Sequence, residues 1–215
     1  MMAAGAVGCM KESLMSQSKF QRVWFWSVFR RSKALFALAV LSTAMELPDH
    51  VATLDQVFRR QKFPKLWTAS MESTHMLLLQ IAGVFHTFLR ARILKHLDSA
   101  SACRLDNWCN ALCFLNNAFS TRPSLLALNP LLSCFQCGGL SLELCLQRQA
   151  ESVGLGSGAL SAADANRSFL PSLLMPRFYS WLYHWSPWPS APYLVASGMS
   201  LLAAEVVGPW TFARL

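Results

Sequence analysis

The sequence is short of isoleucine, of acidic residues and of charge in general. Only Ile81 and Ile93 are isoleucines, whereas 35 residues are leucine, and 11 Asp and Glu stand against 19 Lys and Arg. Charged residues make up 14% of the chain, compared with about 25% in an average soluble domain. With so little charge to cover its surface, the folded chain must either present apolar area to a membrane or a partner, or be poorly soluble.

The sequence also lacks the motifs of common catalytic and cofactor sites. It contains no Gly-Lys-Ser/Thr phosphate loop and no Gly-x-Ser-x-Gly elbow. The five histidines do not fall into the spacing of a metal site or a catalytic triad, and the carboxylates are too sparse to suggest an acid–base pair. We therefore predict a non-enzymatic protein without a cofactor or a metal.

Charge divides the chain into a basic part and a neutral part. Residues 1–97 carry 13 Lys and Arg and 5 Asp and Glu, whereas residues 98–215 carry 6 of each. Composition subdivides these parts further. We distinguish a basic-aromatic N-terminal segment (1–47), a basic helical region (48–97), a Cys- and Leu-rich region (98–151), a Ser/Gly/Ala linker (152–168) and a Pro- and aromatic-rich C-terminal region (169–215).

The apolar pattern predicts a mainly α-helical, loosely packed fold. Helices are expected near 18–43, 50–62 and 71–97, and a further short helix near 194–206. Asp49 and Ser70 are the expected N-caps of the second and third helices. Five prolines lie between residues 171 and 192, among aromatic residues. We therefore expect the C-terminal half to be poorly ordered.

The longest apolar stretch lies within the third expected helix. It runs from Met76 to Leu89, too short to cross a hydrocarbon layer about 30 Å thick. Glu72 and His75 prevent its extension toward the N-terminus. The sequence therefore favours a buried helix over a membrane-spanning one.

The N-terminal segment is basic, rich in serine and poor in acidic residues, and it contains a cluster of aromatic residues. Its composition fits an interfacial helix or a mitochondrial targeting segment, and equally an ordinary amphipathic helix packed on the rest of the chain. In the interfacial interpretation the side chains in contact with anionic headgroups are Trp24, Trp26, Arg30, Arg31 and Lys33. A second group of predicted membrane contacts, of the kind found in aromatic belts, consists of Trp181, Trp185 and Trp188.

Residues 30–44 have the order of a secretory signal. Basic residues precede a short apolar run, and Ser42, Thr43 and Ala44 follow it as small residues. Cleavage after Ala44 would remove Cys9 and leave six cysteines, an even number suited to disulfides, and Asn166 begins a glycosylation sequon. A buried helix is the favoured alternative for this segment.

Three further patterns permit a functional interpretation. Cysteines at 109, 113, 134 and 137 have spacings that a zinc site could use, although free thiols are favoured. The stretch 58–67 interleaves cations with aromatic residues, as a patch for phosphate or anionic lipid does, although a solvated helix end is favoured. The terminal tripeptide Ala213-Arg214-Leu215 is a variant of a peroxisomal address.

These patterns favour a non-enzymatic, membrane-associated polypeptide whose short apolar helices insert partially. Its expected partners are membrane lipids with anionic headgroups. No nucleic-acid module surrounds the basic residues, so no nucleic-acid partner is expected, and no protein partner is indicated. Two alternatives stay open: a secreted or lumenal disulfide-bonded glycoprotein cut after Ala44, and a young or spurious open reading frame without selected function. A membrane is the leading location; the secretory pathway, the mitochondrion and the peroxisome are the alternatives.

Overall fold

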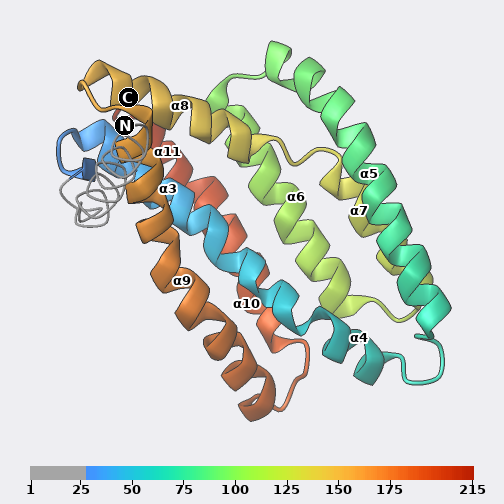
Figure 1. The fold of residues 1–215 in the computed structure, drawn as a ribbon. Helices are drawn as coiled ribbons and strands as arrows, with labels where there is room; N and C mark the ends of the chain where they lie inside the picture. Colours follow the sequence, from blue (N-terminus) through green and yellow to red (C-terminus); the bar gives the residue numbers. More distant parts are fainter. Residues whose placement is uncertain (1–27) are drawn as a thin grey trace, which may run out of the picture.

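The computed structural model describes residues 28–215, of which 84% are helical. The prediction of a mainly helical fold is confirmed. Over these residues the chain makes six successive passes through the molecule (Figure 1). They are α3 (Lys33–Glu46) continued by η1 (Leu47–Leu54) and α4 (Asp55–Lys62), then α5 (Ala69–His96), α6 (Ser99–Phe119), η2 (Pro123–Ala127) with α7 (Leu128–Ser133) and α8 (Gly138–Ser152), α9 (Ser157–Trp185), and finally α10 (Ala191–Leu202), η3 (Ala203–Val207) and α11 (Gly208–Phe212).

The connections between passes are short, so consecutive passes run in opposite directions. End I is the side of the bundle at which α3 begins and at which α5, α8 and α11 finish (Figure 1). The end that holds α4 and the last turns of α6 and α9 is end II (Figure 1). The start of α3 and the last residues of the chain meet at end I.

Local capping explains where several helices begin. The Ser32 hydroxyl accepts a hydrogen bond from the Leu35 N–H, Thr68 caps α5 through the Met71 N–H, and Asp98 caps α6 through the Ser101 N–H. The expected helix at 71–97 therefore exists, but Thr68 rather than Ser70 is its N-cap. Asp49 caps no helix, because the chain continues from α3 into η1 without a break.

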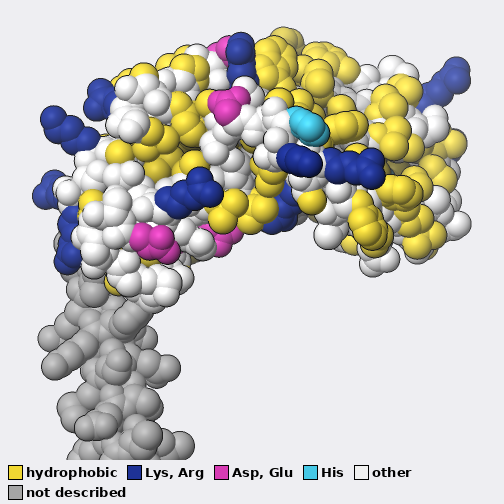
Figure 2. Space-filling model, turned by 90° about the horizontal axis from the view of Figure 1, so that it is seen from above, with side chains coloured by type: hydrophobic (Ala, Val, Ile, Leu, Met, Phe, Trp, Pro, Cys, Tyr) yellow, Lys and Arg dark blue, Asp and Glu magenta, His cyan; other side chains and the backbone are white. Residues whose placement is uncertain are grey.

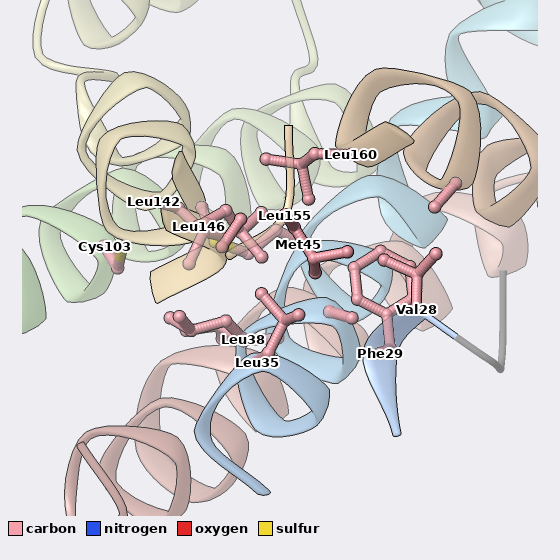
Figure 3. Close-up of a cluster of buried hydrophobic side chains, with 14 of the residues drawn as sticks. Val28, Phe29, Leu35, Leu38, Met45, Cys103, Leu142, Leu146, Leu155 and Leu160 are labelled. Atoms are coloured by element: carbon pink, nitrogen blue, oxygen red, sulfur yellow. The ribbon is translucent and has the colours of Figure 1, made fainter. Parts of the chain in front are cut away.

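Two large hydrophobic clusters hold the passes together, and a smaller one of Phe63, Trp67 and Leu126 joins the α4–α5 connection to η2. One joins α3 to α8, the α8–α9 connection and α9, with Leu35, Leu38, Met45, Leu142 and Leu146 pointing toward one another (Figure 3). The other lies nearer end II, where Val51, Phe58 and Phe114 pack with Tyr179, Tyr183 and Tyr193. All three tyrosines of the chain are thus core residues. Since α3 is largely buried in the first cluster, the favoured interpretation of residues 34–44 as a buried helix agrees with the structure.

The expected disorder of the C-terminal half is not confirmed, because this half consists of packed helices. The proline count was misleading. Pro123, Pro192 and Pro209 each occupy the first turn of a helix, where the missing N–H is not needed. Pro171 and Pro176 lie inside α9, which continues through them.

The expected linker at 152–168 is much shorter than its composition suggested. Only 153–156 connect α8 to α9, and Gly154 adopts a positive φ of 70° there. From Ser157 onward the small residues form the first turns of α9, where Leu160 and Ala163 are buried. The small residues of these turns, among them Ala163, allow α9 to approach α3 and α8.

α6 and α8 cross closely at Gly138. A Cβ atom at Gly138 would lie 2.7 Å from both the Cβ of Asp106 and the Cα of Cys103, whereas a Cβ atom at Gly139 would meet nothing within 4 Å. The Gly139 N–H donates to Asp106 Oδ2 at 3.0 Å. The crossing therefore needs glycine at 138 and only a backbone N–H at 139.

We predict that Gly138→Ala destabilises the bundle by about 1–3 kcal/mol, because the new methyl group overlaps backbone and side-chain atoms of α6. Gly139→Ala is the matched control, since it adds the same methyl group to open space. Thermal unfolding of both variants in detergent measures the difference. Equal midpoints for the two variants would contradict the close crossing of α6 and α8.

Candidate functional site

Within the described residues, four helical segments are long and apolar enough to cross a membrane. They are Lys33–Lys62, Ala69–His96, Pro123–Ser152 and Ala191–Phe212. The two remaining passes, α6 and α9, are 21 and 29 residues long and run beside them (Figure 1). The surface and the polar interior of this bundle are therefore the features that bear on function.

Most of the large apolar side chains in the middle of α5 are exposed. It lies at the edge of the bundle (Figure 1), and Figure 2 shows hydrophobic side chains over much of the side on which α5 and α7 lie. Only His75 and Ala82 are buried in a helix of 28 residues. The exposed side chains include Met76, Leu77, Leu78, Ile81, Val84, Phe85 and Phe88. The prediction that this apolar stretch is a buried helix is therefore wrong.

The polar residues that seemed to limit this stretch face the protein. Glu72 forms an ion pair with Arg60 of α4 at 3.2 Å. His75 is buried beside Trp67, with 5.8 Å between the ring centroids. Because both side chains turn inward, they do not interrupt the exposed apolar surface, and the helix is about 42 Å long at 1.5 Å per residue. That length exceeds a hydrocarbon layer of about 30 Å.

α9 exposes a second apolar surface, which ends in the predicted tryptophans. Trp181 and Trp185 lie on the last turns of α9, and Trp188 follows in the connection to α10 at end II. Their side chains are 55%, 77% and 68% exposed, so all three are free to contact a surrounding phase. Toward the middle of the helix the exposed large apolar side chains are Phe169, Leu170, Leu173, Leu174 and Phe178.

The predicted basic contacts lie at end I. Arg30, Arg31 and Lys33 are exposed at the start of α3. Arg30 and Lys33 line a pocket of about 400 Å³ together with Arg214 and Trp210 from the end of the chain, and the Arg214 guanidinium lies 4.1 Å from the centre of the Trp210 ring. Trp24 and Trp26, predicted as membrane contacts with them, lie outside the described residues.

The basic-aromatic stretch at 58–67 folds inward. Phe58, Phe63 and Trp67 are buried. The Lys62 ammonium donates to the carbonyl oxygens of Asn117 and Ala118 at 2.7 and 2.8 Å, where α6 ends and these carbonyls have no partner within the helix. The stretch therefore anchors α4 to α6, and its aromatic rings are not available as a lipid or phosphate patch.

A buried arginine joins α9 to α3. Arg167 Nε donates to Asp164 at 2.8 Å, and Arg167 Nη1 donates to Glu46 at 2.9 Å and to Thr43 at 3.1 Å. Its Nη2 donates to Ser168. The guanidinium thus has partners on both helices, as a charge in an apolar interior requires.

Polar side chains of α6 form a second interior network. Gln136 Nε2 donates to Asn110 Oδ1 at 2.5 Å. Asn129 of α7 accepts from Asn116 and donates to Asn117, both at 2.8 Å. Amide side chains therefore tie α6 to the pass that contains α7.

A central cavity of about 600 Å³ lies between α3, η1, α6, the start of α8, and α9. Three carboxylates line it, Glu46, Asp49 and Asp106, and one cation, Arg167. The other lining residues are Ser42, Met45, Ala52, Asn110, Phe114, Gln136, Gly139, Leu142 and Ser168. None of these residues belongs to a site pattern that is recognisable in the sequence. The available signal was the presence of isolated charges, Glu46 and Arg167, inside otherwise apolar or small-residue helices.

The six cysteines of residues 28–215 are free thiols, and all but Cys145 are buried. Cys113 donates to the Asn129 carbonyl, and Cys134 to the carbonyls of Ala82 and Pro130. In this part of the chain, no group of three or more His, Cys, Asp or Glu residues is arranged to hold a metal ion. The structure therefore does not bring Cys109, Cys113, Cys134 and Cys137 together as a zinc site.

Two predicted sites of modification or targeting lie on the surface. Asn166 is exposed, but it lies within α9 rather than in a loop. Leu215 is 56% exposed at the end of the predicted tripeptide, whereas Arg214 stacks on Trp210.

Outside the candidate spans, hydrogen bonds from Ser101 lower the pKa of the Asp98 carboxyl below its ordinary value, which strengthens the cap of α6.

Comparison with family models, with curated proteins and with solved structures found no match. The structure by itself shows a helical bundle with four segments long and apolar enough to span a membrane, many exposed large apolar side chains, and a mainly apolar interior that also holds several polar side chains.

We predict that Arg167→Leu lowers the stability of the bundle by about 1–3 kcal/mol, because it leaves Glu46, whose side chain is only 27% exposed, without its cationic partner. Arg177→Leu is the control: Arg177 lies on the same helix, but it is exposed. Thermal unfolding in detergent compares the two variants. A shift of the same size for both would show that Arg167 has no special structural role.

Proposed function

We propose that this protein is a non-enzymatic, integral membrane protein whose bundle of helices spans the bilayer. The observation that carries the proposal is α5, a helix of 28 residues whose apolar side chains face outward around most of its circumference. A large apolar side chain that is fully exposed to water lacks the stabilisation of roughly 1.5–3 kcal/mol that complete burial would provide. Hydrocarbon around α5 would supply that burial without another protein.

The distribution of polar groups supports the same proposal. Arg167, Asp106, Asn107 and Asn117 are buried, whereas many leucines, phenylalanines and tryptophans are exposed. In a bilayer, polar side chains are retained where they face the bundle interior and find partners there. Arg167, Asp106 and Asn117 have such partners in this bundle.

Side chains at the two ends fit the interfaces of a bilayer. Trp181, Trp185 and Trp188 at end II have the exposure expected of an aromatic belt. At end I, Arg30, Arg31 and Lys33 are placed to contact anionic headgroups. Cations that precede the first candidate span favour a cytoplasmic location of end I.

The alternative of a secreted product cut after Ala44 is less well supported. Cleavage there would divide α3 and separate Leu35, Leu38 and Leu41 from the largest core cluster. The free, mostly buried thiols give no framework of disulfides to replace that core. The alternative of an unselected reading frame predicts no cooperative unfolding, which the thermal unfolding proposed above also measures.

The proposal predicts that Phe85→Lys impairs membrane integration. Phe85 lies near the middle of α5 and is 60% exposed, so the lysine would meet hydrocarbon at a cost of roughly 3 kcal/mol. Phe119→Lys is the matched control, because Phe119 is 68% exposed but lies at the last residue of α6, at end II. The fraction of each chain that resists carbonate extraction measures integration.

We expect Phe119→Lys to behave as the unaltered chain does and Phe85→Lys to enter the soluble fraction or be degraded. If Phe85→Lys instead remained in the pellet and raised the yield of folded protein, α5 would face water, and the proposal would fail.

An even number of passes predicts that both ends of the described chain lie on one side of the membrane. Lys33→Cys and Leu215→Cys at end I should react with an impermeant maleimide from the same side. Arg122→Cys, in the exposed connection after α6 at end II, should react only from the opposite side. Labelling of each variant in sealed vesicles, with the unaltered chain as the blank, measures the side of the membrane on which each cysteine lies. Labelling of all three from one side would contradict the six-pass topology.

A further inference from the structure

We infer that a pocket at end I binds the phosphomonoester group of an anionic lipid, such as a diacylglycerol phosphate. The pocket has a volume of about 400 Å³ and is lined by Arg30, Ser32, Lys33, Phe36, Trp210 and Arg214. We call it the end-I pocket. The inference rests on the proposed function, because a lipid reaches this pocket only if end I lies among the headgroups of a bilayer. It deepens that function, since it assigns one chemical group of the lipid to one pocket.

The end-I pocket is positively charged, and the protein does not balance this charge. Arg30 and Lys33 come from the start of α3, and Arg214 follows α11. None of the lining residues is acidic, and among residues 28–215 no carboxylate forms an ion pair with any of the three cations. A pocket lined by charges of one sign concentrates ions of the other sign, and an anion that enters it relieves the repulsion between the cations.

Hydrogen bonds hold together the two segments that form the pocket. The buried Thr211 hydroxyl of α11 donates to the Ala37 carbonyl of α3 at 3.2 Å. Where α3 begins, the Gln149 amide of α8 donates to Ser32 Oγ at 3.3 Å. The backbone that carries the cations is therefore fixed in the packed bundle, so a ligand does not have to order it on binding.

The polar groups of the pocket are suited to phosphate oxygens. The guanidinium groups of Arg30 and Arg214 offer paired N–H donors that match two oxygens of a phosphate. Ser32 Oγ accepts from the Leu35 N–H and from Gln149, and since its hydroxyl donates to no other residue of 28–215, its hydrogen is left for a ligand. Ser32 is also the N-cap of α3, a helix of 14 residues, so the positive end of the helix dipole adds to the charge of the side chains.

Aromatic side chains of the pocket favour a lipid over a soluble phosphate ester. The Arg214 guanidinium lies 4.1 Å from the centre of the Trp210 ring, a cation–π contact that orients the guanidinium. Trp210 is 39% exposed, and tryptophan is enriched where a membrane meets water. Trp210 and Phe36 line the same pocket as the cations. The carbon atoms of a lipid therefore find apolar partners beside the groups that hold its phosphate.

The number of cations favours a phosphomonoester over a phosphodiester. A phosphomonoester carries about −1.5 to −2 charges at neutral pH and has three terminal oxygens. A phosphodiester carries a single negative charge and has only two unesterified oxygens. Three cations and a hydroxyl offer more charge and more donors than a phosphodiester uses, so the pocket should select the phosphomonoester.

The test is calorimetric titration of the full chain in neutral detergent with dihexanoyl phosphatidic acid, corrected for the heat of titrating detergent alone. We expect saturable binding of one molecule per chain. Dihexanoyl phosphatidylglycerol, a phosphodiester with the same acyl chains, should bind roughly tenfold more weakly, because it carries less charge. Glycerol 3-phosphate should also bind roughly tenfold more weakly, because it lacks the carbon atoms that contact the aromatic rings.

Two exposed arginines provide a matched pair of variants. Arg214→Gln should weaken the binding of phosphatidic acid by about tenfold or more, because it removes a charge and paired donors from the pocket. Arg31→Gln is the control, since Arg31 is equally a cation at end I and lies between pocket residues in the sequence, but does not line the pocket. This variant should bind as the unaltered chain does.

Absence of saturable binding, an equal affinity for phosphatidylglycerol, or an equal loss of affinity in the two variants would overturn the inference. An equal affinity for glycerol 3-phosphate would also overturn it, because the pocket would then be a site for a soluble phosphate ester. Extraction with carbonate tests the proposed function separately. A chain that resists extraction but does not bind phosphatidic acid would refute this site alone, whereas a chain that binds it in detergent but is extracted would refute the membrane-spanning bundle.

Discussion

The bundle depends on α6 finding partners for its polar side chains on other passes. Asp106 accepts from α8, Asn116 and Asn117 bond to α7, and the last carbonyls of α6 accept from Lys62 of α4. At end I, Glu205 of η3 accepts from Arg104 and Trp108. A helix with so many polar groups is stable in an apolar setting only when its neighbours satisfy them. These bonds therefore set the order and the register of the passes around α6.

Much of the outer surface of the bundle, by contrast, consists of large apolar side chains. α5 shows this most clearly, because its charged and polar residues at 72 and 75 turn toward α4 and the loop before it, and its leucines and phenylalanines turn outward. The hydrogen bonds of the interior and the apolar surface of α5 thus both follow from how polar and apolar side chains are sorted between the inside and the outside of the bundle. The cavity lined by Asp49 and Asp106 is the place where this sorting is incomplete, since neither carboxylate forms an ion pair among the described residues.

Helix content and several helix positions followed from the sequence, because caps and apolar periodicity are local. The exposure of α5 did not. Its apolar stretch looked too short since Glu72 and His75 were counted as polar limits, and only the tertiary contacts show that both face inward. Proline-rich composition suggested disorder, yet prolines at first helical turns stabilise helix starts. Arg167 and Asp106 could not be assigned a role, because their partners lie on passes far away in sequence.

The central claim is that α5 faces hydrocarbon, and spin labels along α5 test it most directly. Nitroxides placed one at a time at residues 77, 81, 85 and 88 of the full chain in liposomes report collisions with oxygen, which concentrates in the bilayer core, and with a water-soluble nickel complex. The account predicts high oxygen and low nickel accessibility at all four positions, with the oxygen maximum near residue 85. Nickel accessibility as high as that of a label in the exposed connection at residue 122 would contradict it.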